Sequence, residues 1–174
     1  MKLSKITIAY GLYIIISASF IQQVWKFLGE AAGEGNVKRG GIFLFCTLSF
    51  FILRRIVKFH FSAARLIVNV IILFVAFAFA WSKPIFVEKM HVIEYGILGW
   101  LVTRDFSKDR AAFKSIVASL IFILIIGSLD EFFQKILPYR VGEVRDVVIN
   151  IISGAFGVIL YLSAFAENPA HGRG

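Results

Sequence analysis

Six apolar segments, separated by short polar stretches, follow one another along this 174-residue chain. They are Ile6–Leu28, Gly41–Val57, Ala64–Trp81, Ile85–Val102, Phe113–Leu137 and Val144–Phe165. Most reach the roughly 17–25 residues that a helix needs to cross a bilayer. Backbone groups in hydrocarbon must find hydrogen-bond partners within their own segment, which favours helices over strands. The sequence therefore predicts an all-α fold, a polytopic membrane helical bundle of about six transmembrane helices.

Composition agrees with this prediction and excludes some function classes. Hydrophobic residues make up 59% of the chain, whereas globular domains are about 45–50% apolar. The net charge of +8 comes from Lys and Arg placed between the apolar segments, which is typical of membrane topology signals and not of a nucleic-acid-binding face. Cys46 is the single cysteine, so an intrachain disulfide and a cysteine metal site are excluded.

The ends and connections of the segments follow from local signals. A basic start and the small residues from Ser17 resemble a signal peptide, but apolar character continues through Trp25, which favours a retained helix. The Gly- and Glu-rich stretch Gly29–Gly40 predicts a loop, and Pro84 and Pro138 are expected to break helices. Residues 167–174 are predicted to form a flexible tail.

The distribution of Lys and Arg predicts the orientation in the membrane. With a cytoplasmic N-terminus, 11 of the 19 basic residues lie inside and 8 lie outside. The two densest basic clusters both fall inside, as the positive-inside rule requires. We therefore expect a multi-pass protein of the bacterial cytoplasmic (inner) membrane, with both termini in the cytoplasm.

The densest group of polar side chains lies between the fifth and sixth apolar segments. Its members are Asp130, Glu131, Gln134, Arg140, Arg145, Asp146 and Asn150. Ionisable groups are costly near lipid, so groups at the membrane boundary are candidates for a functional site. In the fourth segment His91, Glu94 and Tyr95 share one helix face. Both sets fall near the outer end, so we expect them to line one cavity that opens to the outside.

Glycine spacing predicts how the walls of that cavity pack. Gly154 and Gly157 in the sixth segment are small enough to let a neighbouring helix approach closely. We expect the cavity to be walled by the fourth, fifth and sixth segments near Gly154. Structural alternatives remain for some residues: Gln134 and Asn150 could serve as hydrogen bonds between helices, and Arg145 as a solvated charge.

These residues form three blocks that resemble the VanZ-like family of small bacterial membrane proteins. The blocks are Lys89-Met-His91-Val-Ile-Glu94-Tyr95-Gly-Ile-Leu98-Gly99, Asp130-Glu131-Phe-Phe-Gln134-Lys-Ile-Leu-Pro138-Tyr-Arg140, and Asp146-Val-Val-Ile-Asn150-Ile-Ile-Ser-Gly154. The resemblance spans about Asn69 to Phe165. It implies a four-helix core within residues 63–166, to which residues 1–62 add two transmembrane helices. It also implies a connection with lowered susceptibility to teicoplanin.

The chemistry of the polar residues suggests a phosphate-bearing lipid, or a lipid-linked cell-wall precursor, as ligand. Arg140, with Arg145 or Lys89, would hold phosphate, because the planar guanidinium bonds two oxygens at once. The remaining candidate binding residues are Glu94, Tyr95, Gln134 and Asn150. Whether the protein is an enzyme stays open; the acid/base candidates are His91, Asp130, Glu131 and Asp146.

Other readings of the same residues remain open. Asp130, Glu131 and Asp146 could instead ligate Mg²⁺, which favours oxygen ligands. The protein could also bind or mask an antibiotic target without catalysis, or be a proton-coupled transporter. Transport is disfavoured because the polar groups stop near Tyr95 and Asn150. Membrane lipids are expected partners, nucleic acid is not, and the oligomeric state is left open.

Overall fold

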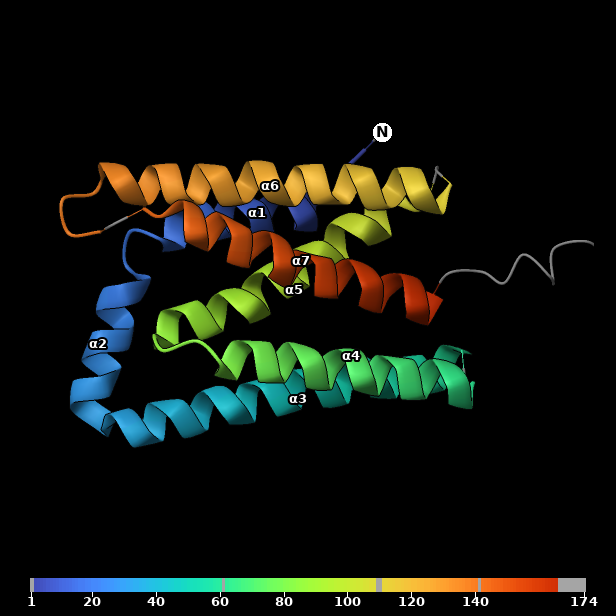
Figure 1. Cartoon of the computed structure of the whole chain (residues 1–174), viewed down its shortest axis with the longest axis horizontal. Coiled ribbons are helices and arrows are strands. Elements are labelled where there is room, and N and C mark those ends of the chain that lie inside the picture. Colours follow the sequence, from blue (N-terminus) through green and yellow to red (C-terminus); the bar gives the residue numbers. More distant parts are fainter. Residues whose placement is uncertain (1, 61, 109–110, 141, 166–174) are drawn as a thin grey trace, which may run out of the picture.

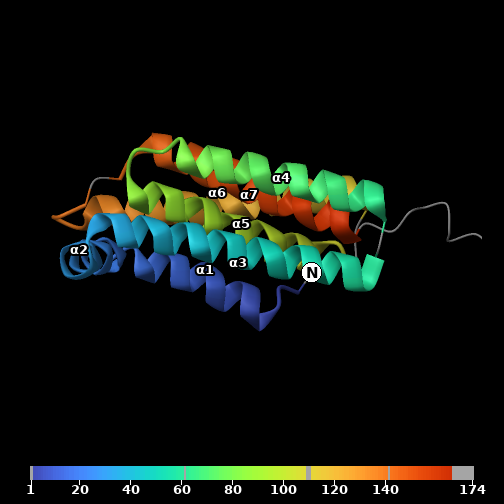
Figure 2. The ribbon, with the colours of Figure 1, turned by 90° about the horizontal axis from the view of Figure 1, so that it is seen from below.

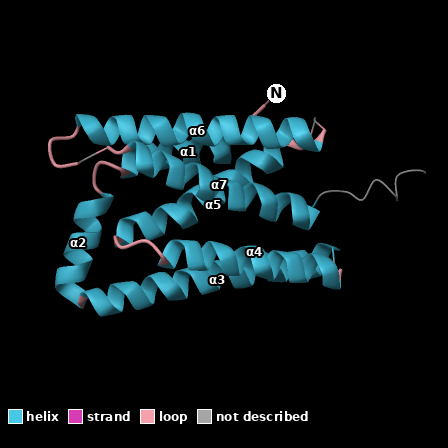
Figure 3. Cartoon of the chain, in the orientation of Figure 1, coloured by secondary structure: helices cyan, strands magenta, loops and turns pink. Residues whose placement is uncertain are grey.

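The computed structural model describes residues 2–60, 62–108, 111–140 and 142–165 and shows seven helices there (Figure 1). The helices are α1 (Lys5–Ser17), α2 (Ile21–Ala32), α3 (Glu34–His60), α4 (Ala63–Trp81), α5 (Phe86–Phe106), α6 (Ala112–Ile136) and α7 (Val144–Phe165). Within the described residues there is no strand, as Figure 3 also shows. The all-α prediction is confirmed.

Six of the helices run roughly along one axis, whereas α2 crosses one end of the bundle (Figures 1 and 2). In the view of Figure 1, α6 and α1 form one side, α7 and α5 the middle, and α4 and α3 the other side. Helix α5 packs against α7, α6, α4 and α1. The helix that carries His91, Glu94 and Tyr95 is therefore enclosed by others on several sides.

Glycines bring α5 and α7 into backbone contact. A Cβ atom added at Gly99 would lie 2.1 Å from the carbonyl oxygen of Gly154, and one added at Gly157 would lie 1.9 Å from that of Gly96. Side chains of any size would force the two helices apart. The prediction that Gly154 and Gly157 allow a close approach is confirmed, and the partner is α5.

The surface is apolar and part of the interior is polar, as expected for a protein surrounded by lipid. Phe43, Phe74 and Phe113 are each more than two-thirds exposed, whereas Asn69 and Asn150 are fully buried. Helices α3, α4, α6 and α7 have the length and apolar composition of membrane spans, and the bent pair α1–α2 would make a fifth. The chain is a helical membrane protein.

The first apolar segment departs from its predicted form. Instead of one helix over Ile6–Leu28, the chain forms α1 and α2, whose axes differ by 67°. At the bend the hydroxyls of Ser17 and Ser19 donate to the carbonyls of Ile14 and Ile16, three residues earlier. Such local side-chain bonds compete with the helical ladder and commonly bend a helix.

The predicted loop over Gly29–Gly40 is also wrong. Helix α2 continues to Ala32 and α3 begins at Glu34, so only Gly33 separates them. Gly33 has a φ of 83°, a conformation that glycine adopts without steric cost. The other boundaries lie close to those predicted, and the predicted tail at residues 167–174 lies outside the described residues.

Candidate functional site

Three polar side chains near the end of α6 face the protein interior. Asp130, Glu131 and Gln134 are 1%, 5% and 3% exposed, respectively. On the same turns Leu129, Phe132 and Ile136 are exposed. The end of α6 therefore turns its apolar face to lipid and its carboxylates inward, because burying them among polar partners costs less than placing them in hydrocarbon.

Asp130 contacts α5 through one of its two carboxylate oxygens. The Tyr95 hydroxyl donates to Oδ2 at 2.9 Å, while Oδ1 is buried without a hydrogen-bond partner among the described residues. The Tyr95 ring, itself 0% exposed, stacks on the His91 ring with centroids 5.9 Å apart. Tyr95 thus connects the imidazole of His91 with the carboxylate of Asp130.

Helix α7 adds an amide to this group. Gly127 of α6 leaves room for Asn150 and Tyr95: a Cβ atom placed there would lie 3.4 Å from Asn150 Cβ and 3.6 Å from Tyr95 Cε1. Asn150 also adjoins His91. Both polar atoms of its buried side-chain amide, and Nδ1 of His91, lack a hydrogen-bond partner within the described part of the chain. Three helices therefore meet at one polar point.

A second layer of contacts holds the connection between α6 and α7 against this group. Glu131 Oε2 accepts from the backbone N–H of Glu143 at 3.1 Å, and Glu131 Oε1 accepts from Gln134 Nε2 at 3.3 Å. Gly142 lies so close to α6 that an added Cβ atom would be 2.2 Å from the Glu131 carbonyl oxygen. The carboxylate of Glu131 is therefore committed to holding the loop.

Arg140 joins this loop to the bend between α1 and α2. One terminal nitrogen donates to Gln134 Oε1 and the other donates to Gln22 Oε1 at 2.7 Å. Nearby, the hydroxyl of Tyr139 donates to the carbonyl of Ser19 at 2.9 Å. The Arg140 Nε is buried without a partner among the described residues. Arg140 is thus half-buried beside the polar group, with its Nε–H unpaired among the described residues.

Arg145 lies apart from Arg140 and has its own partners. It pairs with Glu88 of α5 at 2.5 Å, and more distantly with Asp146 at 3.3 Å and Glu143 at 3.7 Å. Sequence analysis did not single out Glu88, which is 5% exposed. Its position in the first turn of α5, three residues before His91, was the available signal. The expectation that Arg145 would hold phosphate jointly with Arg140 finds no support in this pairing.

Lys89 and Glu94 also interact with groups other than Arg140. The Lys89 ammonium donates to the backbone carbonyls of Trp81 and Lys83 at the end of α4. Glu94 is close enough to Asp130 and to Tyr10 of α1 for electrostatic interaction with both. Of the ten predicted residues, the structure therefore brings together His91, Tyr95, Asp130 and Asn150, with Glu94, Glu131, Gln134 and Arg140 around them.

The donor set can accept and release protons but is not arranged as a metal site. Among the described residues, no group of three His, Cys, Asp or Glu side chains is placed to hold a metal ion. The alternative that Asp130, Glu131 and Asp146 together ligate Mg²⁺ finds no support in this arrangement. Two cavities of the described residues, one between α3, α4, α5 and α7 and one beside α2, are lined by other residues. The predicted common cavity stays a prediction.

A second polar cluster, at the opposite end of the bundle, was not foreseen. Asp105, 5% exposed at the end of α5, accepts from Ser4 N at 2.8 Å, from Thr7 Oγ1 at 2.6 Å and from Arg104. Arg104 also donates to the Ser4 hydroxyl at 2.9 Å. The sequence separation of about 100 residues hid this cluster. Because both carboxylate oxygens have partners, its role is to anchor α1 to α5.

The fold and the polar group define a class: a polytopic helical membrane protein with a buried polar cluster at one end of its bundle. A family model described as VanZ/LLP1 matches residues 5–165, nearly the whole chain. The chain belongs to the VanZ/LLP1 family. No curated protein and no solved structure matches it.

The extent of the family match corrects one expectation. The resemblance was expected to begin at about Asn69, with the two N-terminal transmembrane helices as an addition, whereas the match begins at residue 5. Helix α1 accordingly packs on α5 and α6, and its Ile14 belongs to the same core cluster as Tyr95 and Ile126. The division of the chain into two N-terminal helices (residues 1–62) and a four-helix core (residues 63–166) stays a prediction.

Proposed function

We propose that the protein binds the phosphate-bearing head group of a membrane lipid or lipid-linked envelope precursor at the polar cluster of α5, α6 and α7. Through this ligand it would affect susceptibility to glycopeptides such as teicoplanin. The observation that carries the proposal is a group of buried polar atoms at this cluster that have no partner among the described residues. These atoms are His91 Nδ1, Asp130 Oδ1, Arg140 Nε and both side-chain amide atoms of Asn150.

Unpartnered buried atoms favour a ligand on energetic grounds. Each buried polar group left without a hydrogen bond costs about 1–3 kcal/mol, so native proteins rarely keep several together. A bound molecule with its own donors and acceptors would recover this free energy. Because the atoms come from three helices, the ligand would also fix the helices relative to one another.

The charges suggest how such a ligand would be oriented. Arg140, half-buried beside Gln22, would hold phosphate, since guanidinium and phosphate form paired hydrogen bonds. The carboxylate of Asp130 would repel phosphate and accept instead from a hydroxyl or amine. The ligand chemistry is therefore an anion with a hydrogen-bond donor a short distance away, as in a lipid head group that carries a sugar, glycerol or amine.

The proposal includes the side of the membrane. By the Lys/Arg distribution, the end of the bundle with Asp130 and Arg140 faces outward, and both termini face the cytoplasm. The proposed location is the bacterial cytoplasmic membrane.

If the bound molecule is also transformed, His91 and Asp130 are the acid/base pair to test. They are connected through Tyr95 by the stacked ring and the 2.9 Å hydrogen bond. Glu131 is less suited because it holds the backbone of Glu143. Binding without transformation, which would mask an antibiotic target, uses the same contacts and differs only in turnover.

Proton-coupled transport is the less favoured alternative. Below Tyr95 the interior continues as an apolar cluster that includes Leu98, Val102, Ile123 and Val158. A proton relay would need titratable groups there, and among the described residues the next buried carboxylate is Asp105 at the far end of α5. The apolar layer between the two clusters supports a binding site over a pathway.

The experiment combines lipid identification with two charge-neutralising variants. The native chain, Arg140→Gln and Asp130→Asn are each purified. Lipids that co-purify with each protein are then extracted and identified by mass spectrometry. The phospholipid that is enriched with the native protein should be at least about tenfold less abundant in both variants. Such a decrease corresponds to a loss of about 1.4 kcal/mol of binding free energy. Lys135→Gln, which removes an exposed cation on the last turn of α6, is the matched control and should retain it.

Stability measurements distinguish a binding role from a structural one. If Asp130 and Arg140 serve a ligand, both variants should express and melt close to the native protein. Removing a strained functional group can even raise stability. Loss of folding in both variants, or equal lipid content in all four proteins, would reject the proposed binding site.

A further inference from the structure

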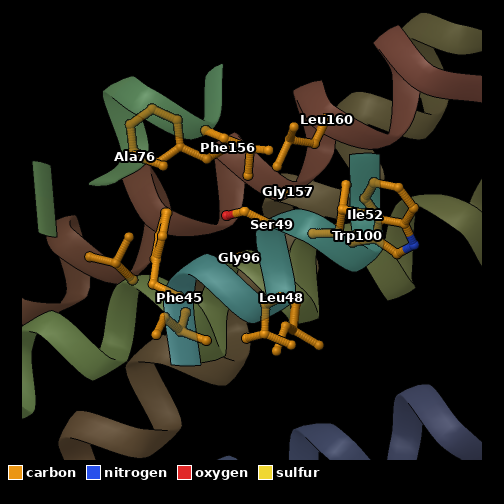
Figure 4. A pocket seen from close by; sticks show the side chains of 14 residues that line it. Phe45, Leu48, Ser49, Ile52, Ala76, Gly96, Trp100, Phe156, Gly157 and Leu160 are labelled. Atoms are coloured by element: carbon orange, nitrogen blue, oxygen red, sulfur yellow. The ribbon is translucent and has the colours of Figure 1, made fainter. Parts of the chain in front are cut away.

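An apolar groove of about 280 Å³ lies between α3, α4, α5 and α7. Figure 4 shows its side chains gathered around one space, with Ser49 as the polar side chain labelled among them. Phe45 comes from α3, Leu73 from α4, Trp100 from α5 and Phe156 from α7. Three of these four helices have the composition of membrane spans, so the groove lies at the depth of lipid chains.

The groove and the polar cluster occupy different faces of α5. Val92, Ile93 and Gly96 line the groove, whereas Tyr95 contacts Asp130 on the side of α6. The groove therefore contributes nothing to the proposed function above and must be explained separately. A dry apolar space open to a bilayer is filled by what surrounds it, which is hydrocarbon.

Three lysines lie at one end of the bundle: Lys38 near the start of α3, Lys83 just after α4 and Lys89 near the start of α5 (Figure 1). Lys89 donates to the carbonyls of Trp81 and Lys83, which use two of the three N–H groups of its ammonium. Lys83 lies 4.0 Å from the centre of the Phe79 ring, and Lys38 is close enough to repel Lys89. Positive charges gathered at one end of a bundle favour an anion beside them.

Helix geometry connects the lysines with the groove. Phe45 follows Lys38 by two turns along α3, and Val92 follows Lys89 by one turn along α5. From Val92 to Trp100 the groove extends about 12 Å along α5, at 1.5 Å per residue. An anionic head group at Lys38 and Lys89 would thus lie one to two turns from the apolar groove along these two helices.

We propose that this groove binds one anionic phospholipid, with its phosphate between Lys38, Lys83 and Lys89 and one acyl chain along the groove as far as Trp100. Basic pockets between transmembrane helices are suited to anionic head groups. Glu34, which pairs with Lys38 at 3.7 Å, is exposed and can yield to a phosphate. The ligand belongs to the bilayer itself and needs no transport to its site.

The proposal is tested by fluorescence quenching of Trp100. The protein carrying Trp25→Phe and Trp81→Phe is reconstituted in phosphatidylcholine vesicles with increasing fractions of brominated phosphatidylglycerol or brominated phosphatidylcholine. Bromine on a lipid chain quenches tryptophan on contact. Half-maximal quenching of Trp100 should need a mole fraction of brominated phosphatidylglycerol at least about fivefold lower than the corresponding mole fraction of brominated phosphatidylcholine.

Two variants and two matched controls locate the bound lipid. Lys38→Gln should reduce the preference for phosphatidylglycerol about fivefold, whereas Lys135→Gln at the same end of the bundle should not. Ser49→Phe should fill the groove and remove the preferential quenching. Ile121→Phe, on an exposed position of α6, should leave it unchanged.

Three results would overturn the proposal. Equal quenching by the two lipids would show that the groove has no anionic preference. An equal effect of Lys38→Gln and Lys135→Gln would show that the preference is a property of the whole surface. Absence of quenching by either lipid, together with a dimeric mass in native mass spectrometry, would show that a second copy of the chain covers the groove.

Discussion

Tyr95 is in contact with both groups on which acid/base chemistry at the site would depend. Its hydroxyl supplies the hydrogen bond to Asp130, and its ring supports His91. A phenol is suited to this position because one end packs as a hydrocarbon while the other donates a hydrogen bond. Tyr95 is therefore best understood as a positioning residue that holds the Asp130 carboxylate toward α5.

The first prediction concerns that hydroxyl. Tyr95→Phe keeps the ring but removes the donor to a buried carboxylate, which should lower the free energy of unfolding by about 1.5–3 kcal/mol. Denaturant unfolding in detergent micelles measures the loss. Tyr161→Phe, at a partly buried tyrosine beside Trp100, is the control and should change stability by less than about 0.5 kcal/mol. Equal effects of the two changes would contradict the proposed positioning.

The second prediction concerns the cluster at the other end of the bundle. Thr7→Val replaces the hydroxyl that donates to Asp105 at 2.6 Å with a methyl group of similar shape. Stability should fall by about 1.5–3 kcal/mol, because a hydrogen bond to a charged group is lost. Lipid content and resistance phenotype should stay native, since this cluster only anchors α1. A selective loss of bound lipid without a loss of stability would instead make Asp105 part of the function.

At this scale the sequence predicted the inward-facing residues but not all their partners. Asp130 and Asn150 are placed by helix periodicity and by the cost of a polar group in lipid, and both are buried as expected. The pairing of Arg145 with Glu88 depends on how α5 and α7 pack and on which side-chain rotamers they adopt. No spacing within one helix encodes a contact between residues so distant in the chain.

At the scale of helices, the crossing of α5 and α7 determines where the site residues meet. Gly96 and Gly99 on one helix face Gly154 and Gly157 on the other, with backbone atoms in direct contact. In a membrane such close packing replaces the hydrophobic effect as a source of association. The approach also brings Asn150, one turn before Gly154, next to the His91 side of α5.

The third prediction tests this crossing. In Gly157→Ala the new Cβ atom would lie 1.9 Å from the Gly96 carbonyl oxygen, so the helices must separate. We expect destabilisation of about 3 kcal/mol or more, at the upper end for overpacking. Gly40→Ala in α3 is the control: a Cβ atom there meets nothing within 4 Å, and stability should change by no more than about 1 kcal/mol. Comparable melting of the two variants would show that the crossing adapts freely.

Helix boundaries were predictable where the apolar pattern and a proline agreed. Helix α6 ends before Pro138, and α7 has the predicted bounds. The bend after α1 was missed because Ser17 and Ser19 interrupt the ladder without reducing the apolar content of the segment. Gly33 was missed for the opposite reason: a glycine-rich stretch suggested a loop, but one residue with positive φ was enough to turn the chain.

At the scale of the whole molecule, the polar cluster of α5, α6 and α7 and the cluster around Asp105 lie at opposite ends of one bundle.

The fourth prediction concerns which end of the bundle faces outward. In a Cys46→Ala background, a cysteine at Tyr139, a half-exposed position, should react with a membrane-impermeant thiol reagent in intact cells. A cysteine at Lys114, near the start of α6 and at the opposite end, should react only after lysis. The reverse pattern would place the polar cluster in the cytoplasm and reject an external ligand.

The length of α1 has a consequence for the bilayer around the protein. Its 13 residues extend about 20 Å, roughly 10 Å less than the hydrocarbon thickness of a typical membrane. Hydrophobic mismatch of this kind is relieved by local thinning of the bilayer. The thinned sector would lie beside α1, where Gln22 and Arg140 meet. Lipid head groups there would descend toward Asp130, so the ligand would approach through a dimple in the membrane surface.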